Sequence, residues 1–521
     1  MKKIPVRIDT HLVFKLDDLG PIPVKALREA FTRSNPQFWK KKRMGFWIGD
    51  TSRTIESWKI EGDKFLMLPR GAKDKINEVL APHNMQIGEV TDRTVSCKPA
   101  GFSIREGESL RPDQVPVVNF LVQKKNAIVR GPPGSGKTVI LLGAIVKINQ
   151  PAVVVVHSNL LREQWQDAVV RWLGVEPGVL GGGKKKLAPI TIATQQTLWR
   201  MVKEQNLSWV QNFSALIADE CHRWSSKTFN AVAEMFPATY RLAASADERR
   251  KDQKEFLLYE TFGTDVYKIK KSTLVRSGHL LPTSIEVVPT NYRDGLYLAS
   301  VRAGMFCDEC GGVLTASRHE RLKGVKHCSK CNLASMRTET PDWPGMLNRI
   351  VEDKDRNTLI LDYLVKVLKQ DPDSRVLILS ERVQACRQWV AKLTLQDIPA
   401  GLLIGSPKNR QELTRTVAGL QSGKLRVGVG TTVADEGLDI PALTHVFITC
   451  PVHTHPKRLR QMVGRSARPF GNKKEGKAIY FWDREMFPPL IEGIKPSKHE
   501  SQCKSLLKKM AGVVDELTLL E

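Results

Sequence analysis

Short apolar runs rich in β-branched residues alternate with longer amphipathic stretches along the middle of the chain. The first such block extends from Leu110 to about Ile269 and contains NAIVR, AVVVV, ITIAT and ALIAD. A second block begins near Arg356, contains VLIL, LRVGVG and HVFIT, and fades after Phe481. Because such alternation is typical of βαβ units, each block predicts a parallel sheet with helices packed on it.

Residues 1–105 follow another pattern, with short apolar segments between turn signals such as IGD and EGD. A chain of 521 residues is also too long for one hydrophobic core. The predicted fold class is α/β, with several units. We expect a small α/β accessory domain over 1–105, a first lobe over 106–285, an insert over 300–340, a second lobe over 345–490 and a helical tail over 491–521.

Hydrophobic residues make up 41% of the chain, which is enough for several cores. The sequence has no run of the about 18 apolar residues that a membrane-spanning helix needs. Its first residues, MKKIPVRIDTHLVF, lack the apolar stretch and small-residue cleavage site of a secretory signal. We therefore expect a cytoplasmic or nucleoid-associated protein with no transmembrane segment and no membrane partner.

The chain is strongly basic, with 80 Lys and Arg against 55 Asp and Glu and a formal net charge of +25. Such an excess attracts polyanions, and the binding depends on salt because counterions are released from the nucleic acid. A nucleic acid is therefore the first expected partner. The alternative is a charged surface that serves only solubility.

GPPGSGKT follows the strand-like NAIVR and precedes the helix-like VILLGAIVKI, which is the context of a phosphate-binding loop. Its glycines let backbone N–H groups face phosphate oxygens, Lys137 reaches the β- and γ-phosphates, and the Thr138 hydroxyl takes a magnesium position. A glycine-rich turn without a ligand is the alternative. The predicted ATP-binding residues of this loop are Gly131, Gly134, Ser135, Gly136, Lys137 and Thr138.

A pair of adjacent acids follows the apolar strand in SALIADECH. Asp219 is predicted to bind magnesium, and Glu220 to orient or deprotonate the attacking water. Adjacent acids at a strand end also occur in solvated turns, and the preceding phosphate loop favours the catalytic interpretation.

At these residues the sequence resembles a known family. DECH resembles motif II of the superfamily 2 helicases and translocases, and the other motifs occur in that family's order. LRPDQ resembles the segment whose glutamine recognises adenine, which implies that Arg111 and Gln114 contact the nucleotide. VVVVHSNLLREQW and ITIATQQTL resemble motifs Ia and Ib, which contact a nucleic-acid backbone in the family.

The later motifs follow in the same order. VGVGTTVADEGLDIP resembles motif V, which implies that Gly437 and Asp439 belong to the nucleotide site. SADERRKD resembles motif III, which links the γ-phosphate to lobe movement in the family. Here Asp247 and Glu248 stand where Thr and Pro are usual, a departure that concerns the coupling of hydrolysis to movement.

QMVGRSAR resembles motif VI and is expected on a helix. The spacing would then put Gln461, Arg465 and Arg468 on neighbouring faces, because three or four residues make one turn. Two guanidinium groups aimed into a cleft can stabilise charge on a γ-phosphate, as an arginine finger does. A basic surface patch is the alternative.

The resemblance covers Leu110 to Arg468 apart from the insert, and it implies two RecA-like lobes that use ATP and magnesium. It implies an ATP-dependent DNA helicase or translocase, most similar to double-strand DNA translocases, branched-DNA helicases of phage and bacteria and related repair helicases. An RNA helicase is one alternative, with RNA as the partner. A nucleic-acid-binding switch or scaffold that lacks processive unwinding is another.

Two Cys-x-x-Cys pairs between the lobes have the spacing of a tetrahedral zinc site. Two disulfides are the alternative, disfavoured in a reducing compartment. The predicted zinc-ribbon-like insert has many basic residues, which suggests contact with nucleic acid or a protein. The predicted zinc ligands are Cys307, Cys310, Cys328 and Cys331.

Two further segments are basic. FWKKKRMGFW, Phe38–Trp47, interleaves basic and aromatic residues, which fits stacking on bases or, alternatively, aromatic residues in a domain core. GGGKKK, Gly181–Lys186, is expected to be a loop that either contacts nucleic acid or is simply solvated. The N-terminal domain and the insert are also the expected sites for protein partners.

Overall fold

The computed structural model describes most of the chain, which forms two compact units. The first unit contains Met1–Gly131 and Ser135–Lys270, and the second contains Pro132–Gly134 and Lys271–Glu521. The described residues are 1–43, 45–205, 207–221, 226–246, 254–296, 314–315, 326–328, 330–331, 334–335, 343–405, 410–431, 440–449, 456–483 and 516–519.

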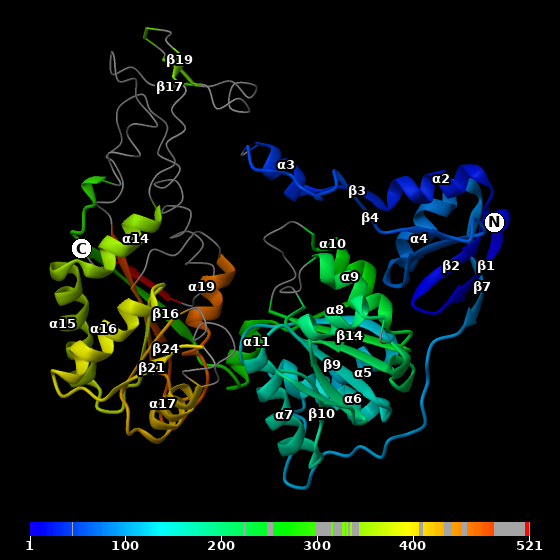
Figure 1. Ribbon diagram of the computed structural model, residues 1–521. Helices are drawn as coiled ribbons and strands as arrows, with labels where there is room; N and C mark the ends of the chain where they lie inside the picture. Colours follow the sequence, from blue (N-terminus) through cyan, green and yellow to red (C-terminus); the bar gives the residue numbers. More distant parts are fainter. Residues whose placement is uncertain are drawn as a thin grey trace. The chain divides into compact units, whose positions relative to one another are not determined.

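The N-terminal part of the first unit is a small α/β domain (Figure 1, blue). Its sheet has the strand order β5-β6-β2-β1-β7, with β1 and β7 parallel and the other pairs antiparallel. The sheet strands are β1 (Lys2–Ile8), β2 (His11–Lys15), β5 (Lys59–Glu61), β6 (Phe65–Pro69) and β7 (Met85–Asp92). The helices are α1 (Leu16–Leu19), α2 (Pro21–Ala30), α3 (Pro36–Arg43) and α4 (Lys73–Leu80), with short 3-10 turns η1 (Arg70–Ala72) and η2 (Ala81–His83).

One core holds this domain together. Leu27 of α2 and Ile76 and Leu80 of α4 are fully buried together with Phe14 and Leu66 of the sheet. Burial of one such side chain contributes about 1.5–3 kcal/mol. A separate antiparallel pair, β3 (Thr32–Ser34) and β4 (Thr54–Glu56), carries α3 in the loop between its strands.

The rest of the first unit contains an eight-stranded sheet with the order β11-β10-β12-β9-β13-β14-β8-β15. All neighbours are parallel except β10 and β11, which confirms the predicted βαβ architecture. The strands are β8 (Asn126–Arg130), β9 (Ala152–Val156), β10 (Gly178–Gly181), β11 (Lys184–Lys186), β12 (Ile190–Thr194), β13 (Ala215–Ala218), β14 (Tyr240–Ser245) and β15 (Val266–Lys268). The helices are α5 (Val115–Lys124), α6 (Lys137–Ile148), α7 (Asn159–Leu173), α8 (Gln195–Lys203), η3 (Ser208–Asn212), α9 (Ser226–Met235) and α10 (Phe256–Phe262).

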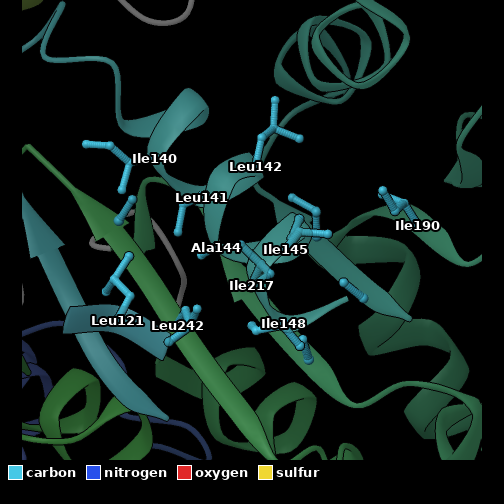
Figure 2. Packing of buried hydrophobic residues seen from close by; sticks show 14 of the residues in the cluster. Leu121, Ile140, Leu141, Leu142, Ala144, Ile145, Ile148, Ile190, Ile217 and Leu242 are labelled. Atoms are coloured by element: carbon cyan, nitrogen blue, oxygen red, sulfur yellow. The ribbon is translucent and has the colours of Figure 1, made fainter. Parts of the chain in front are cut away.

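Helices cover both faces of this sheet, so its central strands β9, β12 and β13 are buried on both sides. All five residues of AVVVV in β9 are buried, as expected for a central parallel strand. On one face, Ile145 and Ile148 of α6 pack with Ile217 of β13 and Leu242 of β14 (Figure 2). This packing fixes α6, and with it the loop that precedes α6.

The second unit contains a seven-stranded parallel sheet with the order β21-β22-β20-β23-β24-β16-β25. Its strands are β16 (Thr283–Thr290), β20 (Val376–Leu379), β21 (Ala400–Leu403), β22 (Val427–Gly430), β23 (His445–Ile448), β24 (Gly476–Asp483) and β25 (Glu516–Leu519). Its helices are α11 (Lys271–Arg276), α14 (Trp343–Glu352), α15 (Lys354–Gln370), α16 (Val383–Thr394), α17 (Arg410–Ser422) and α19 (Pro456–Val463).

Two expected boundaries need correction. The first lobe was expected to end at residue 285, but the division lies after Lys270, and β16 pairs along its whole length with β24 of the second sheet. A helical tail was expected over 491–521, but residues 516–519 form β25, which pairs with β16. Pairing with a distant strand determines both structures, and local helix propensity does not predict it. The rest of the expected tail lies outside the described residues.

GGGKKK is a hairpin and not an irregular loop. β10 ends at Gly181, β11 begins at Lys184, and the two strands pair antiparallel. Gly182 and Gly183 at the tip have φ of 60° and 83°, the left-handed values that a tight two-residue hairpin turn requires. The three lysines of β11 are exposed.

In the described parts of the expected insert, three short strands form an antiparallel sheet. They are β17 (Leu314–Thr315), β18 (Lys326–Cys328) and β19 (Ala334–Ser335), with β18 in the centre.

Among the described helices, we found none with the length and apolar character needed to span a membrane.

Candidate nucleotide site

The predicted site residues of the first unit lie at the carboxyl ends of its central strands. The phosphate loop follows β8, Asp219 follows β13, and Ser245 ends β14. β13 pairs with β14, and β14 pairs with β8, all parallel, so these ends meet at one edge of the sheet. This edge is where open parallel α/β sheets bind ligands.

The loop after β8 has the geometry of a phosphate cradle. Gly136 has a φ of 82° and immediately precedes α6, and a Cβ there would lie 2.5 Å from Gln114 Nε2. Only glycine satisfies both the left-handed backbone and the close approach. Lys137 is the first residue of α6, and its Nζ donates to the Gly131 carbonyl at 3.2 Å. The loop therefore presents a helix N-terminus and an ammonium group to the same space.

The predicted adenine-recognition segment packs directly beside this loop. Arg111 Nη2 donates to the Ser135 carbonyl at 3.0 Å, and its other guanidinium contacts are with Asp113, at 2.9 and 3.1 Å. Gln114 is 2% exposed, and its Oε1 accepts from the Arg111 N–H at 3.1 Å. The structure thus brings Arg111 and Gln114 to the loop, as the motif order predicted.

Asp219 is a buried carboxylate, 4% exposed. Its Oδ1 accepts from the Glu220 N–H at 2.8 Å, and its Oδ2 accepts from Trp165 Nε1 at 2.9 Å. Burial, followed by the nearby Glu220 carboxylate, raises the pKa of Asp219 to about 6, while the Trp165 N–H and the Lys137 ammonium lower it. A nearby cation favours the ionised carboxylate in such an environment.

Glu220 occupies an unusual backbone conformation. Its φ is 45°, in the left-handed region that costs a non-glycine residue about 1–2 kcal/mol. Backbone strain of this kind is concentrated at functional sites, where the surrounding structure enforces it. The sharp turn places two carboxylates side by side at the end of β13.

Trp165 is a residue of this site whose role the sequence did not predict. It lies in REQW of the motif Ia resemblance, on α7, and it is 1% exposed. Sequence alone does not distinguish a buried tryptophan that packs from one that donates to a carboxylate. The hydrogen bond to Asp219 identifies Trp165 as a positioning residue for that side chain.

The strand β14 is tied to the phosphate loop. The Gly131 N–H donates to the Ser245 carbonyl at 3.1 Å, which joins the first motif III residue to the first residue of the loop. Asp247 and Glu248, which depart from the family pattern, lie outside the described residues. So do Gly437 and Asp439 of motif V.

Motif VI is only partly helical. α19 ends at Val463, so Gln461 lies in its last turn, whereas Arg465 lies in the turn that follows and Arg468 in the bend after that turn. The expectation of one continuous helix is wrong, and Gly464, a poor helix former, directly follows its last residue. The Arg465 N–H donates to the Met462 carbonyl at 3.1 Å, so the chain tightens there. Burial lowers the pKa of Arg468 to about 10, which leaves it charged at neutral pH.

Half of the predicted zinc site is described. Cys328 ends β18 with 2% exposure, and its Sγ accepts the Lys330 N–H at 3.3 Å, while Cys331 is exposed. Cys307 and Cys310 lie outside the described residues. Over the part of the chain that the structure describes, no three His, Cys, Asp or Glu side chains gather as a metal-binding group.

Two protein-family models match the chain, one in each parallel-sheet lobe. Residues 107–247 match "Type III restriction enzyme, res subunit", and residues 359–469 match "Helicase conserved C-terminal domain". The first match contains the phosphate loop and the Asp219–Glu220 pair, and the second contains Gln461 to Arg468. These matches support the resemblance to superfamily 2 helicases that the motifs indicated.

The chain is also similar in sequence to curated proteins that are named as DNA helicases or translocases. The chain is 25% identical over 395 residues to "DNA 3'-5' translocase XPB2" of Sulfurisphaera tokodaii, covering 75% of this chain and 84% of the relative. It is 22% identical over 363 residues to "Putative DNA 3'-5' helicase Rad25" of Halobacterium salinarum, covering 69% of this chain and 52% of that relative. Among solved structures, the Pyrococcus furiosus Hef helicase domain aligns with a TM-score of 0.46 at 15% identity, over 72% of this chain and 96% of the other.

Proposed function

We propose that the protein is an ATP-dependent DNA helicase or translocase, which couples ATP hydrolysis to movement on DNA or to its remodelling. One observation carries the proposal. The adenine-recognition segment, the phosphate loop and an adjacent carboxylate pair converge at one edge of a parallel sheet in a chain with two helicase-type domains. Phosphoryl transfer needs positioned charges more than covalent chemistry, and this edge supplies them.

The residues of the first unit have separate roles in ATP hydrolysis. Gln114 and Arg111 bind the base, and the loop N–H groups with Lys137 bind the phosphates. Lys137 Nζ now bonds the Gly131 carbonyl, a bond that it would exchange for a phosphate oxygen. Glu220 positions the attacking water and accepts its proton.

Magnesium fits the donor set at this edge. The Asp219 carboxylate and the Thr138 hydroxyl are the hard oxygen ligands that this ion takes alongside phosphate oxygens. When bound, magnesium neutralises charge that develops on the phosphates. Trp165 holds Asp219 in position for that contact. We assign Gln461, Arg465 and Arg468 to stabilising charge on the γ-phosphate from the second lobe, with Gly437 and Asp439 as further nucleotide contacts.

DNA is the proposed nucleic acid. The net charge of +25 favours a polyanion, and the relatives named above are DNA translocases or helicases. An RNA helicase shares every chemical residue. A switch that binds ATP without processive unwinding is the second alternative, motivated by Asp247 and Glu248 in the motif III segment.

Hydrolysis rates with four nucleic acids test this proposal. We expect duplex, forked or single-stranded DNA to stimulate ATP hydrolysis, and Lys137→Ala to abolish it. Stimulation by RNA alone would overturn the DNA assignment. Tight DNA binding without stimulation would support the switch, and strand-displacement assays then distinguish a helicase from a translocase.

We also propose that the four insert cysteines bind one zinc ion. The Lys330 N–H that donates to Cys328 Sγ suits a thiolate ligand, because hydrogen bonds from the surrounding backbone orient and tune metal ligands. Zinc would stabilise a segment too small for its own core. Metal analysis of the purified protein should find zinc that Cys307→Ser with Cys310→Ser removes. A metal-free wild-type protein would contradict the site. If DNA and partner binding persist in the variant, the insert is only a structural brace.

A further inference from the structure

Residues 35–53, the loop between β3 and β4, form a segment that we call the arm. The arm begins with α3 and contains the basic and aromatic sequence FWKKKRMGFW. Figure 1 shows α3 beyond β3 and β4, at the end of the N-terminal domain far from β1 and β7. The arm is thus a projection of this domain and not one of its sheet layers.

Three of the four aromatic rings of the arm face solvent, and Phe38 is half-buried. Trp47 is 87% exposed, Phe46 59% and Trp39 40%. In the described part of the domain, the core is built from other residues, such as Phe14 and Phe31. The alternative that the arm aromatics form the domain core is therefore wrong. Exposed rings gathered in one short segment indicate a binding surface.

The net positive charge of the arm favours a polyanion as its ligand. Residues 35–53 include five basic residues and one acidic residue. Lys40, Lys42, Arg43 and Arg53 are exposed, and they lie in the same segment as the exposed rings. Exposed rings together with basic side chains bind single strands, because bases stack on the rings and phosphates meet the cations.

Trp39 is anchored by contacts within the protein, and Trp47 lies against the backbone of the arm. Trp39 Nε1 donates to Ser34 Oγ at 2.6 Å, and the Arg53 guanidinium lies 5.3 Å from the Trp39 ring centroid. Trp47 folds back over Gly49, where a Cβ would lie 2.8 Å from the indole. Rings with restricted motion lose less entropy on stacking, which favours binding.

The base of the arm is fastened to the first helicase lobe. Arg33 pairs with the buried Glu260 of α10 at 3.5 Å and lies 4.4 Å from the Phe256 ring centroid. Lys254 Nζ donates to Gln37 Oε1 of α3 at 3.3 Å. Lys254 is only two residues beyond the motif III segment, which ends at Asp252. DNA held by the arm would therefore be held by the ATP-binding lobe.

We propose that the arm binds unpaired bases of DNA, at a single-stranded end or a branch point, by stacking them on Trp47 and Phe46. This proposal rests on the proposed function, since it specifies which part of a DNA substrate the N-terminal domain contacts. Paired bases do not expose their faces to such rings. The arm thus directs the protein to DNA that already contains unpaired bases.

Equilibrium binding of fluorescent single-stranded, forked and duplex DNA tests the arm, with Phe46→Ala and Trp47→Ala separately and together. Stacking losses measured in other proteins correspond to about 5- to 150-fold weaker binding per ring. We expect losses of that size for single-stranded and forked DNA, and nearly unchanged duplex binding. Trp47→Tyr should restore most of the affinity, because it restores a stacking ring.

A charge variant gives an independent measurement. Lys40→Gln, Lys42→Gln and Arg43→Gln together should reduce the slope of log affinity against log salt by about 2 for single strands. The aromatic variants should leave that slope unchanged. Ile22→Ala is the matched control, because Ile22 is also a 70% exposed apolar residue of the same domain but lies on α2.

The outcomes separate this inference from the proposed function. If wild-type protein binds forked DNA and the Phe46 and Trp47 variants bind it equally well, the arm proposal fails alone. If no DNA binds the wild-type protein or stimulates its hydrolysis, the proposed function fails. Tighter binding of an RNA strand than of the DNA strand, lost in the same variants, would overturn the assignment to DNA. Basal ATP hydrolysis without DNA should be unchanged in all arm variants.

Discussion

Replacing Trp165 by Phe should weaken magnesium-dependent hydrolysis without dismantling the site. The change removes the indole N–H that donates to Asp219 Oδ2 at 2.9 Å and retains an aromatic ring in the buried position. A hydrogen bond to a charged group contributes about 1.5–3 kcal/mol. That energy corresponds to a factor of about 10–150, and loss of a group that orients a metal ligand commonly lowers metal affinity or activity about 10–100-fold.

The assay is DNA-stimulated ATP hydrolysis titrated with Mg²⁺. We expect the half-saturating Mg²⁺ concentration of Trp165→Phe to rise about 10–100-fold, because Asp219 is no longer oriented toward its ligand position. Trp209→Phe is the matched control, since Trp209 is a buried tryptophan of the same lobe that packs against Phe213 and Phe236. A Trp165→Phe titration that coincides with both the wild type and this control would refute the reasoning.

Three further predictions concern stability. Arg356 and Asp483 form a buried ion pair at 2.6 Å, so Arg356→Met should lower the free energy of unfolding in urea by about 3–5 kcal/mol, and adding Asp483→Leu should recover part of that loss. A double variant whose loss is the sum of the two single losses would contradict this. Burial, followed by Lys477, lowers the pKa of His445 to about 4, so the folded state resists its protonation. The neutral imidazole therefore stabilises the folded state fully above about pH 6.5, and about 3 kcal/mol of the free energy of unfolding is lost as pH falls toward 4. His445→Gln should remove this pH dependence of stability, and an equal slope of stability against pH in both proteins would disprove the prediction. Arg70 donates to two carbonyls of the first lobe, Ala238 and Thr239, at 2.5 Å each, so Arg70→Met should lower the protease resistance of the N-terminal domain.

The placement of the phosphate loop and of Asp219 was predictable because the signals are local. A strand, a glycine-rich loop and a helix follow one another in the sequence, and the structure has β8, the loop and α6 in that order. The apolar run of β13 likewise predicts where Asp219 lies. Parallel strands bring such loop ends to one edge of a sheet, so order along the chain was enough.

Contacts between distant segments were not predictable in this way. β16 precedes the insert, yet it lies between β24 and β25, which are formed near the C-terminal end. An alternating apolar pattern shows that β16 is a strand but not which sheet it joins. The bond from Trp165 to Asp219 depends in the same way on the packing of α7 against β9 and β12. Prediction from the sequence therefore failed at contacts between segments that lie far apart in the chain.

The arm shows how a local signal can remain ambiguous until exposure is known. FWKKKRMGFW fits either a core or a binding surface, because apolar rings serve both. Exposure of Trp47 and Phe46 decides between them. The sequence contained the chemistry of this segment, whereas the exposure of its rings depends on tertiary packing, which the sequence pattern did not show.

One short segment connects the nucleotide loop to the arm. At its start, the Ser245 carbonyl accepts from Gly131, and at its end Lys254 bonds Gln37 of α3. Residues 246–253 join these two contacts and include Asp247 and Glu248, which replace the usual Thr and Pro. Ser245 and Lys254, the described residues that make these two contacts, are nine residues apart in the sequence. Because the two contacts are joined by so short a stretch, arm variants should change the DNA stimulation of hydrolysis as well as DNA affinity.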